Sequence, residues 1–320
     1  QTDRSRTGSG SEEIMTRLLI TGASGMLGAN LALLAQNRGY EVLGWTNSRP
    51  LVDAPFTTHA VDFSDQKALA QAFEAAQPDA LINCAAQANV DAAEKHPDYA
   101  FRVNAVAAGE LALMARSANV PMIQLSTDAV FDGTKGNYTE TDAPNPQNTY
   151  AKSKLAGEQA VAEANPEATI ARVVFHGWSL TGARSLAEFF YNNLTAGKPV
   201  NGFTDMFFSP LYVGHLAEAL LEILQKGLSG IYHVYSPESL SKYDFGVRLA
   251  HELGLDASLI RPISALNSDL LTRRSLNLSM NTDKLQAALG KPLQNQAEGL
   301  RALHADLDSG LRQKLLSLNH

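Results

Sequence analysis

Two side chains four residues apart, Tyr150 and Lys154, could carry out acid–base chemistry together. They lie in the segment TYAKSKLAGEQAVAEAN, which we predict to be a helix beginning near Tyr150, so both would occupy one face. A free tyrosine, with a pKa of about 10, is a poor acid–base group at neutral pH. A nearby ammonium, together with an oxidised nicotinamide, would favour the phenolate and lower that pKa. The pair alone is a common surface pattern, so its meaning depends on what precedes it.

A hydroxyl side chain at the end of a predicted strand would complete this pair. The strand Val120 to Leu125 delivers Thr127 at its carboxyl end, where ligands bind in open α/β sheets. Thr127 would hydrogen-bond a carbonyl oxygen, Tyr150 would give that oxygen a proton, and Lys154 would hold the ribose hydroxyls of a nicotinamide cofactor. The sequence therefore predicts a catalytic set of Thr127, Tyr150 and Lys154 for carbonyl reduction.

A glycine-rich turn near the amino terminus is predicted to bind the cofactor. Residues 17–45 have the pattern of strand, glycine turn, helix and strand, with Gly22, Gly25 and Gly28 three residues apart. Glycines let a ligand approach the main chain, and the start of a helix attracts an anion. The spacing differs from the ordinary G-x-G-x-x-G fingerprint, and a glycine triplet alone would also fit a tight turn with nothing bound. The flanking strand and helix favour dinucleotide binding.

The end of the second strand indicates which dinucleotide is bound. An acidic residue there would accept hydrogen bonds from the adenosine ribose and repel a 2′-phosphate. This chain has Thr46, Asn47 and Ser48, followed by Arg49, which could pair with a phosphate. We therefore predict that NADP(H) is preferred and that NAD(H) is possible. The alternative is that Arg49 is a solvated loop residue.

Two further strand ends are predicted to border the cofactor. The third strand, expected at His59 to Phe63, places Asp62 where it could meet an adenine amino group. The fourth strand, expected at Asp79 to Ala86, ends in small residues that leave room for a ligand. Cys84 in this strand is expected to pack as a small hydrophobe, since no basic neighbour in the sequence supports a lowered pKa.

Composition narrows the functional classes. Of the 320 residues, 45% are hydrophobic and 18% charged, and the net charge is 26 − 33 = −7, which argues against a nucleic-acid-binding surface. The single cysteine excludes an intramolecular disulfide and suits a reducing cytoplasm. No apolar run is long enough to span a membrane, and no signal peptide is evident. The eight histidines have no metal-ligand spacing, so no metal site is predicted.

The alternation of strands and helices predicts an α/β fold, a Rossmann-type doubly wound parallel sheet. We expect an NAD(P)-binding domain over residues 15–175, with a return segment at about 205–235. Residues 176–320 are expected to form mainly a smaller, α-rich substrate domain, with helices in 185–198, 211–227 and 241–255. Residues 1–14, which are polar and rich in Gly and Ser, are interpreted as a tag remnant or a disordered lead.

Several motifs together resemble the extended short-chain dehydrogenase/reductase family, and within it the dTDP-4-dehydrorhamnose reductase branch. The residues that carry the resemblance are TGASGMLG, CAAQANVDAAEKHPDYAFRVNA, STDAVFDG, YAKSKLAGE, FFSPLYVGHLAEAL and RRSLNLSMNTDKL, which span roughly Met15 to Leu289. The combination of STD-x-VFDG with Y-x-K-x-K-L-x-G-E is quite specific for this branch. The resemblance implies a nucleotide-sugar substrate, the chemistry of dTDP-rhamnose biosynthesis, and the same catalytic set.

The resemblance also implies binding residues for the cofactor and the sugar nucleotide. Together with the strand-end residues above, the expected cofactor contacts are Gly22, Gly25, Met26, Leu27, Gly28, Asn47, Arg49, Asp62, Phe63, Ala85, Ala86, Tyr150 and Lys154. The expected substrate contacts are Asn89, Val90, Thr127, Phe175 and Arg274. His176 could border the nicotinamide or the sugar, or be a satisfied packing histidine. Arg184, Arg273 and Arg274 could pair with a diphosphate, but most arginines are solvated, so only the Arg273–Arg274 pair, within a family-like motif, is taken as a candidate.

Departures from the family pattern leave the sugar open. Ala129 stands where the family usually has tyrosine, and where 4,6-dehydratases have a glutamate base, which argues against dehydration. Asn30 stands where some rhamnose reductases carry a glutamate for a magnesium-bridged dimer, so monomer and homodimer both remain open. Ser275 replaces the usual proline and Asn281 the usual aspartate.

We therefore expect an NADPH-preferring reductase of a 4-keto nucleotide sugar, with Tyr150 as proton donor. One alternative is an NADP-binding regulatory subunit without turnover, since the regulatory β subunit of methionine adenosyltransferase resembles the same branch. Another is a nucleotide-sugar epimerase that retains its cofactor through the cycle. These alternatives differ in whether NADPH is consumed in proportion to product.

Overall fold

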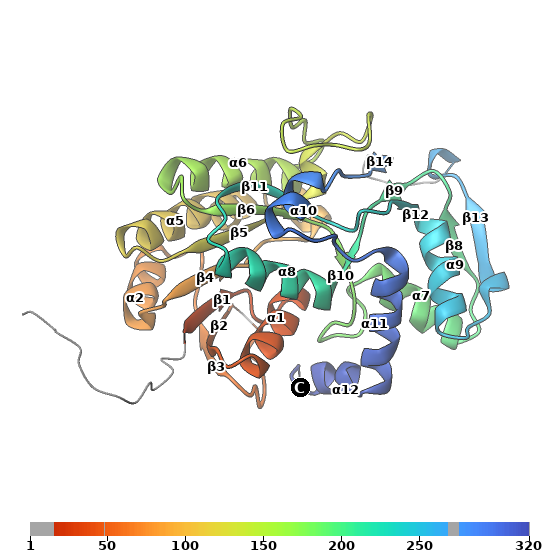
Figure 1. Ribbon diagram of the computed structural model, residues 1–320, viewed down its shortest axis with the longest axis horizontal. Helices are drawn as coiled ribbons and strands as arrows, with labels where there is room; N and C mark the ends of the chain where they lie inside the picture. Colours follow the sequence, from red (N-terminus) through yellow and green to blue (C-terminus); the bar gives the residue numbers. More distant parts are fainter. Residues whose placement is uncertain (1–15, 48, 268–274, 320) are drawn as a thin grey trace, which may run out of the picture.

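The chain is built around a seven-stranded parallel sheet with the strand order β11-β6-β5-β4-β1-β2-β3 (Figure 1). The computed structural model describes residues 16–47, 49–267 and 275–319. The strands are β1 (Arg17–Thr21), β2 (Glu41–Thr46), β3 (Thr57–Ala60), β4 (Ala80–Asn83), β5 (Met122–Thr127), β6 (Thr169–Val173) and β11 (Gly230–Val234). The chain winds outward from β1 to β3, then crosses back to β4 and winds the other way. This order confirms the predicted Rossmann-type doubly wound fold.

The middle of the central strand β1 is apolar because both of its faces are buried. Leu18, Leu19 and Ile20 are fully buried, because helices cover both faces of the sheet. Leu18 and Ile20 pack into the core on one face and Leu19 into the core on the other. The carboxyl ends of β1 and β4 lie side by side, since Thr21 pairs with Asn83. The glycine turn and the end of β4 are thereby brought together at the point where the strand order reverses.

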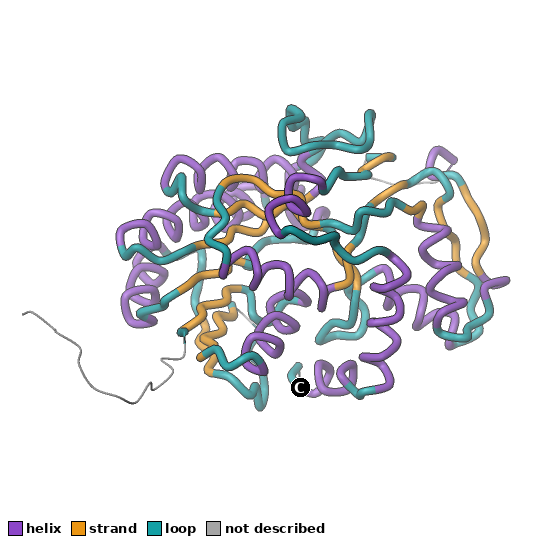
Figure 2. Tube along the Cα trace, viewed as in Figure 1, coloured by secondary structure: helices purple, strands orange, loops and turns teal. Residues whose placement is uncertain are grey.

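Helices form the two outer layers (Figure 2). One face is covered by α1 (Met26–Asn37) and α8 (Val213–Gln225), which pack against each other. The other face is covered by α2 (Gln66–Ala76), α5 (Ala107–Ser117) and α6 (Thr149–Ala164). Helix α6 begins one residue before Tyr150, after Asn148 accepts the Ala151 N–H as its cap. The Asp65 carboxylate caps α2 in the same way by accepting the Lys67 and Ala68 N–H groups, so a side-chain cap fixes the start of each of these two helices.

The bounds of several strands differ from the sequence-based expectation. The fourth strand, expected at Asp79 to Ala86, runs over Ala80–Asn83, and the fifth, expected at Val120 to Leu125, runs over Met122–Thr127. The third strand runs over Thr57–Ala60 and ends before Asp62, because Val61 and Phe63 pack into the core beyond the strand rather than within it. Between β4 and β5 the helical chain is divided into α4 (Pro97–Phe101), the π-helical turn η1 (Arg102–Val106) and α5, and a short helix α3 (Val90–Lys95) precedes them. The π turn is a local widening of the kind often found at functional sites.

Most of the remaining elements gather beyond the carboxyl edge of the sheet, toward the right of Figure 1. The strands there are β7 (Phe175–His176), β8 (Val200–Phe203), β9 (Phe207–Phe208), β10 (Leu211–Tyr212), β12 (Leu240–Ser241), β13 (Ile260–Ile263) and β14 (Asn277–Leu278). The longer helices among them are α7 (Leu186–Thr195), α9 (Lys242–Glu252) and α11 (Gln296–Asp308), and the short ones are η2 (Asp128–Val130), η3 (Ala257–Leu259), η4 (Ala265–Asn267), α10 (Asp283–Leu289) and α12 (Leu311–Ser317). The segments expected to be helical after residue 176 contain α7, α8 and α9.

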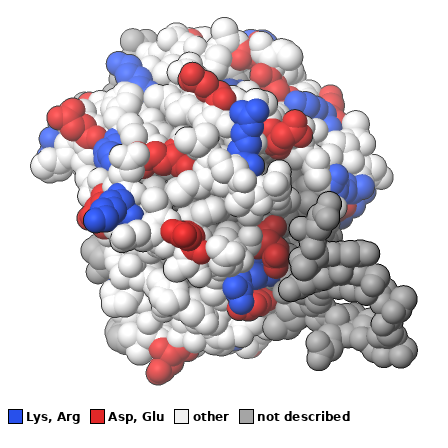
Figure 3. All heavy atoms as spheres, turned by 90° about the vertical axis from the view of Figure 1, so that its left-hand side faces the viewer, with Lys and Arg blue, Asp and Glu red and all other residues white. Residues whose placement is uncertain are grey.

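Segments distant in the sequence return to the main sheet. Strand β11 pairs in parallel with β6, so the segment 205–235 contributes both α8 and the last strand of the sheet. The Val52 N–H donates to the Leu318 carbonyl at 2.9 Å, so the end of the described chain lies against the loop after β2. In the described part of the chain, no helix combines the length and the apolar character needed to cross a membrane. The face shown in Figure 3 carries acidic and basic side chains in a mixed pattern.

Candidate active site

A cleft of about 750 Å³ opens at the carboxyl edge of the sheet. The predicted residues that line it are Gly22, Gly25, Met26, Leu27, Gly28, Arg49, Ala86, Asn89, Val90, Tyr150, Lys154 and Phe175. Thr127, Asn47, Asp62, Phe63 and Ala85 are not among the residues that line it. Arg274 lies outside the described residues. The fold therefore brings the glycine turn, the tyrosine–lysine pair and the expected sugar residues to one cavity.

The glycine turn has the backbone geometry that a dinucleotide requires. Gly22 has a φ of +65°, and a Cβ there would lie 2.9 Å from the backbone of Cys84. A Cβ on Gly28 would lie 2.2 Å from the Gly22 carbonyl oxygen, so this glycine allows α1 to pack closely against the turn. Helix α1 starts after Gly25 with no side-chain cap and no acidic residue in its first turn. Its first N–H groups are thus available to a pyrophosphate, and the residues present fit this group.

The end of β2 lies at one end of the cleft. Arg49 is exposed and lines the cleft, while Asn47 donates to the Tyr99 hydroxyl at 3.3 Å. Asp62 is exposed, and its carboxylate accepts hydrogen bonds from the hydroxyl and the N–H of Ser64 at 2.7 and 2.8 Å. These bonds lower the pKa of Asp62, so it is a carboxylate at neutral pH.

Of the predicted cofactor residues, Phe63 packs in the core and Ala85 makes a hydrogen bond through its backbone. Phe63 is buried and packs edge-on against Trp45, with ring centroids 6.4 Å apart. Ala85 donates its N–H to the Thr21 hydroxyl at 3.1 Å, which fixes the chain just beyond β4. Cys84 borders the cleft, and burial raises the pKa of its thiol to about 12. This agrees with the expectation that Cys84 is a small packing residue rather than a nucleophile.

Tyr150 lines the cleft, and its phenol lies near enough to the Thr127 hydroxyl for that group to influence its pKa. Thr127 in turn donates to the Asp128 carboxylate at 3.0 Å. Burial raises the pKa of Tyr150 to about 12; the nearby Thr127 hydroxyl opposes this rise and the Asp128 charge adds to it. The sequence analysis expected Lys154 and an oxidised nicotinamide to lower the pKa of Tyr150. In the protein alone, burial and Asp128 outweigh the effect of Thr127 and raise this pKa. The phenol therefore keeps its proton at neutral pH.

Lys154 lies one helical turn after Tyr150 and is 4% exposed. Its ammonium donates to the Leu125 carbonyl at 2.6 Å, which aims the side chain at the end of β5. Burial lowers the pKa of Lys154 to about 8, and the nearby Glu158 and Cys84 oppose this effect. The ammonium is therefore the main form at neutral pH.

Two residues at the site were given no role by sequence reasoning. Asn104, in the π turn, is buried; its amide donates to the Ser153 hydroxyl at 2.9 Å and the Gln87 carbonyl at 3.2 Å, and its oxygen accepts the Gln87 N–H at 2.8 Å. It thereby ties the loop after β4 to α6. Asp128 is 7% exposed, and burial raises its pKa to about 6. An asparagine within the apolar run VNAVAAG was the available signal for Asn104, since a buried amide needs partners.

The residues expected beside the sugar occupy two sides of the cleft. Asn89 caps α3 by accepting the Ala92 N–H at 2.8 Å, and Val90 is the first residue of that helix. Phe175, in β7, is half-buried across the cleft. His176 is 1% exposed, is not a lining residue, and has no hydrogen-bond partner for either ring nitrogen within the described chain. It is therefore a packing histidine, but not a satisfied one.

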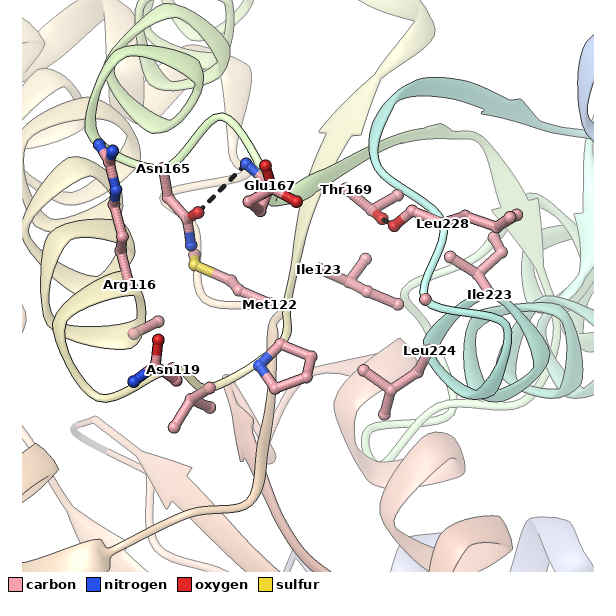
Figure 4. Close-up of a pocket in the computed structure, with 14 residues that line it drawn as sticks. Arg116, Asn119, Met122, Ile123, Asn165, Glu167, Thr169, Ile223, Leu224 and Leu228 are labelled. Atoms are coloured by element: carbon pink, nitrogen blue, oxygen red, sulfur yellow. Dashed lines mark hydrogen bonds between the residues drawn. The ribbon is translucent and has the colours of Figure 1, made fainter.

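A second cavity, of about 310 Å³, lies at the opposite edge of the sheet between α5 and α8 (Figure 4). Its lining is largely apolar, with Met122, Ile123, Ile223, Leu224 and Leu228 directed into it. The Asn165 side chain accepts the Glu167 N–H at 3.2 Å at its rim. None of the predicted site residues lines this cavity, so the larger cleft is the candidate active site.

Comparison with known proteins agrees with this geometry. Residues 15–309 match the family described as the RmlD substrate binding domain. The chain is 34% identical, over 89% of its length and 96% of the relative's, to a probable low-salt glycan biosynthesis reductase, Agl14, of Haloferax volcanii. It is 36% identical to the dTDP-4-dehydrorhamnose reductase of Mycobacterium tuberculosis, over 78% of this chain and 79% of that protein.

The chain is also similar to a relative that is not named as a reductase and to a reductase of known structure. The chain is 33% identical to methionine adenosyltransferase 2 subunit beta of Xenopus tropicalis, over 78% of this chain and 75% of that protein. The crystal structure of dTDP-4-dehydrorhamnose reductase from Bacillus anthracis in complex with NADP superposes with a TM-score of 0.81 at 24% identity, covering 92% of this chain and all of that one. The chain therefore belongs to the RmlD substrate-binding-domain family of extended short-chain dehydrogenase/reductases.

Proposed function

We propose that this protein is an NADPH-preferring reductase of a 4-keto nucleotide sugar. The observation that carries the proposal is that one cleft is lined by Tyr150, by the buried Lys154 one helical turn later, and by a glycine turn at the uncapped start of α1. Residues 15–175 with the return segment would bind the cofactor, and residues 176–320 mainly the substrate. The reductases among its relatives support the same reaction class.

Thr127, Tyr150 and Lys154 each have a separate role in the proposed reduction. NADPH, when bound, supplies a hydride. The Thr127 hydroxyl orients the carbonyl oxygen of the sugar, and the Tyr150 phenol gives that oxygen its proton as the alkoxide develops. At neutral pH the Tyr150 phenol holds the proton that it must donate, but a pKa of about 12 makes it a weak acid, so proton transfer requires the positive charge of Lys154 and of the nicotinamide, as it is oxidised, to lower that pKa. Lys154 holds the ribose hydroxyls of the cofactor with its ammonium.

The nucleotide sugar would lie across the cleft from the cofactor. Asn89, Val90 and Phe175 border the proposed sugar pocket. Arg184 lines the cleft and is exposed, so it could pair with the diphosphate of the substrate. The buried Glu188 carboxylate accepts the Arg184 N–H at 2.8 Å and so fixes the loop that presents this arginine. Arg274 remains a proposed diphosphate ligand from outside the described residues.

The preference for NADPH is predicted to depend on Arg49. Arg49→Ala should raise the Kd for NADPH about 10- to 100-fold, the value of a charge-assisted hydrogen bond to a phosphate, and leave the Kd for NADH unchanged. Nicotinamide fluorescence titrations with both cofactors measure this difference. Arg116→Ala, an exposed arginine at the second cavity, is the matched control. Equal loss of NADPH and NADH affinity would place Arg49 outside the 2′-phosphate site.

The decisive experiment is NADPH oxidation, followed at the nicotinamide absorbance, with a dTDP-4-keto-6-deoxy sugar as substrate and NADH in parallel. Stoichiometric NADPH consumption supports the reductase and excludes an epimerase that retains its cofactor. If NADPH binds but no keto-sugar nucleotide is turned over, the proposal is wrong.

Ala129 is the observation that favours a second function. It is half-buried in η2 next to Thr127 and leaves no side chain where the family usually has tyrosine. A relative named as a subunit of methionine adenosyltransferase is 33% identical to this chain. An NADP-binding regulatory subunit would co-purify with a protein partner and show no turnover, whereas the reductase proposal requires turnover by the isolated chain.

A further inference from the structure

A buried ion pair lies directly behind the proposed catalytic helix. Glu158 of α6 and Arg172 of β6 have side chains that are 4% and 2% exposed. The pair is bidentate, with Arg172 Nη2 donating to Oε2 at 2.7 Å and Nε donating to Oε1 at 2.9 Å. Two charges so deeply buried are costly to desolvate, and their pairing is weak evidence for a stabilising role. Their position suggests a functional role instead.

Glu158 continues the face of α6 that carries Tyr150 and Lys154. The three residues are spaced by four, so they lie one above another along the helix. Consecutive residues at the end of β5 contact two of them, because Leu125 accepts from the Lys154 ammonium and Ser126 donates to Glu158 Oε1 at 2.5 Å. The carboxylate and the ammonium are therefore held to the same short stretch of strand.

Arg172 also contacts the segment that follows Thr127, through the ring of Phe131. Its guanidinium carbon lies 5.0 Å from the centre of the Phe131 ring, and Nη1 lies 3.5 Å from Nε2 of His233. The position of His233 is fixed in turn, since its backbone N–H donates to Glu140 Oε1 at 2.9 Å. The carboxylate orientation of Glu158 is thus fixed from the side opposite to the cleft.

The charges around Lys154 give Glu158 a specific electrostatic effect. The charged or titratable groups that act on Lys154 are Glu158 on its own helix and Cys84 just after β4. Tyr150 precedes Lys154 by one turn of the same helix, and Arg172 of β6 is paired with Glu158. Asp128, beyond β5, faces Tyr150. Cys84 and Tyr150 stay neutral at neutral pH. Glu158 is the anion that opposes the desolvation of the ammonium.

We propose that Glu158 is a positioning residue that keeps the Lys154 ammonium charged over the working pH range, with Arg172 and Ser126 holding its carboxylate in place. The consequence for activity rests on the proposed function, in which Lys154 binds the ribose of the cofactor as a cation. The effect on Lys154 itself does not depend on that function, so the two can fail separately.

The first readout is the titration of Lys154 in the free protein. With ¹³C-labelled lysine, the Cε signal of Lys154, identified by its loss in Lys154→Arg, reports the midpoint by NMR. Glu158→Gln should lower the midpoint by about one pH unit or more, since an opposite charge is replaced by a neutral group while Arg172 remains. Glu163→Gln, the same change at an exposed position on α6, should leave the midpoint unchanged.

A second variant guards against a folding defect, because Glu158→Gln leaves Arg172 buried without its partner. The double variant Glu158→Gln/Arg172→Met removes both charges and should give a midpoint between those of the wild type and the single variant. The basic limb of the kcat/KM pH profile should move in the same order. Equal Lys154 midpoints in the wild type and either folded variant would overturn the proposal, and show that the pair is only structural. This result is independent of whether a sugar substrate has been found.

Discussion

Tyr150→Phe is expected to lower kcat by about 10²- to 10⁴-fold, the range that a positioned general acid contributes, while the Kd for NADPH stays unchanged. The phenol is the protonated group at the cleft that the Thr127 hydroxyl contacts, so its loss removes the proton donor and leaves the ring in place. Tyr150 is not part of the glycine turn or of the β2 end, and these segments supply the proposed pyrophosphate and 2′-phosphate contacts.

Steady-state kinetics and fluorescence titration of NADPH, run on the same preparation, separate the two effects. Tyr40→Phe is a matched control, because the Tyr40 hydroxyl accepts from Gln225 at 3.1 Å and Tyr40 is not a lining residue of the cleft. This control should retain full kcat. Unchanged kcat in Tyr150→Phe would contradict the mechanism, whatever the substrate proves to be.

The helix that carries Tyr150 and Lys154 could be predicted because its chemistry depends on local spacing. A four-residue separation on a helix fixes a shared face before any tertiary contact is known. The same holds for β1, whose uninterrupted apolar run is typical of a strand buried on both faces. The glycine turn could be predicted as well, because it lies between β1 and the leucines that recur at helical spacing in α1.

What the sequence did not reveal depends on packing between distant segments. The π turn at Asn104 arises where a buried amide must satisfy Gln87 and Ser153 at once, and no local pattern encodes that geometry. The direction of the Tyr150 pKa shift depends on burial and on Asp128, neither of which spacing indicates. The third strand was placed too late because Val61 and Phe63 are apolar for core packing beyond the strand.

The second large effect concerns acid stability and His176. This side chain is buried between Tyr212 and Phe245, with ring centroids 5.7 and 4.9 Å away, and both of its nitrogens lack partners within the described chain. Burial, together with the nearby His215, lowers the pKa of His176 from 6.5 to about 3. The native state therefore holds His176 neutral throughout the range in which an unfolded histidine takes up a proton.

The sign of the pH dependence follows from this difference. Below pH 6.5 the unfolded state binds one proton that the native state does not, so the free energy of unfolding falls as the pH falls. From pH 7 to pH 5 the loss through His176 is about 2 kcal/mol, at 1.36 kcal/mol for each pH unit below 6.5. The loss continues until the pH approaches the folded pKa of about 3.

His176→Leu should therefore reduce the loss of stability between pH 7 and pH 5 by about 2 kcal/mol. At pH 7 the variant should be at least as stable as the wild type, because leucine removes a buried N–H that has no acceptor in the described chain. Urea unfolding at both pH values measures the difference. His59→Leu, at an exposed position on β3, should keep the pH dependence of the wild type. If the His176 variant loses as much stability on acidification as the wild type, then His176 is protonated in the native state. In that case its two ring nitrogens must find partners on acidification, and the packing between β7 and α9 must open to admit them.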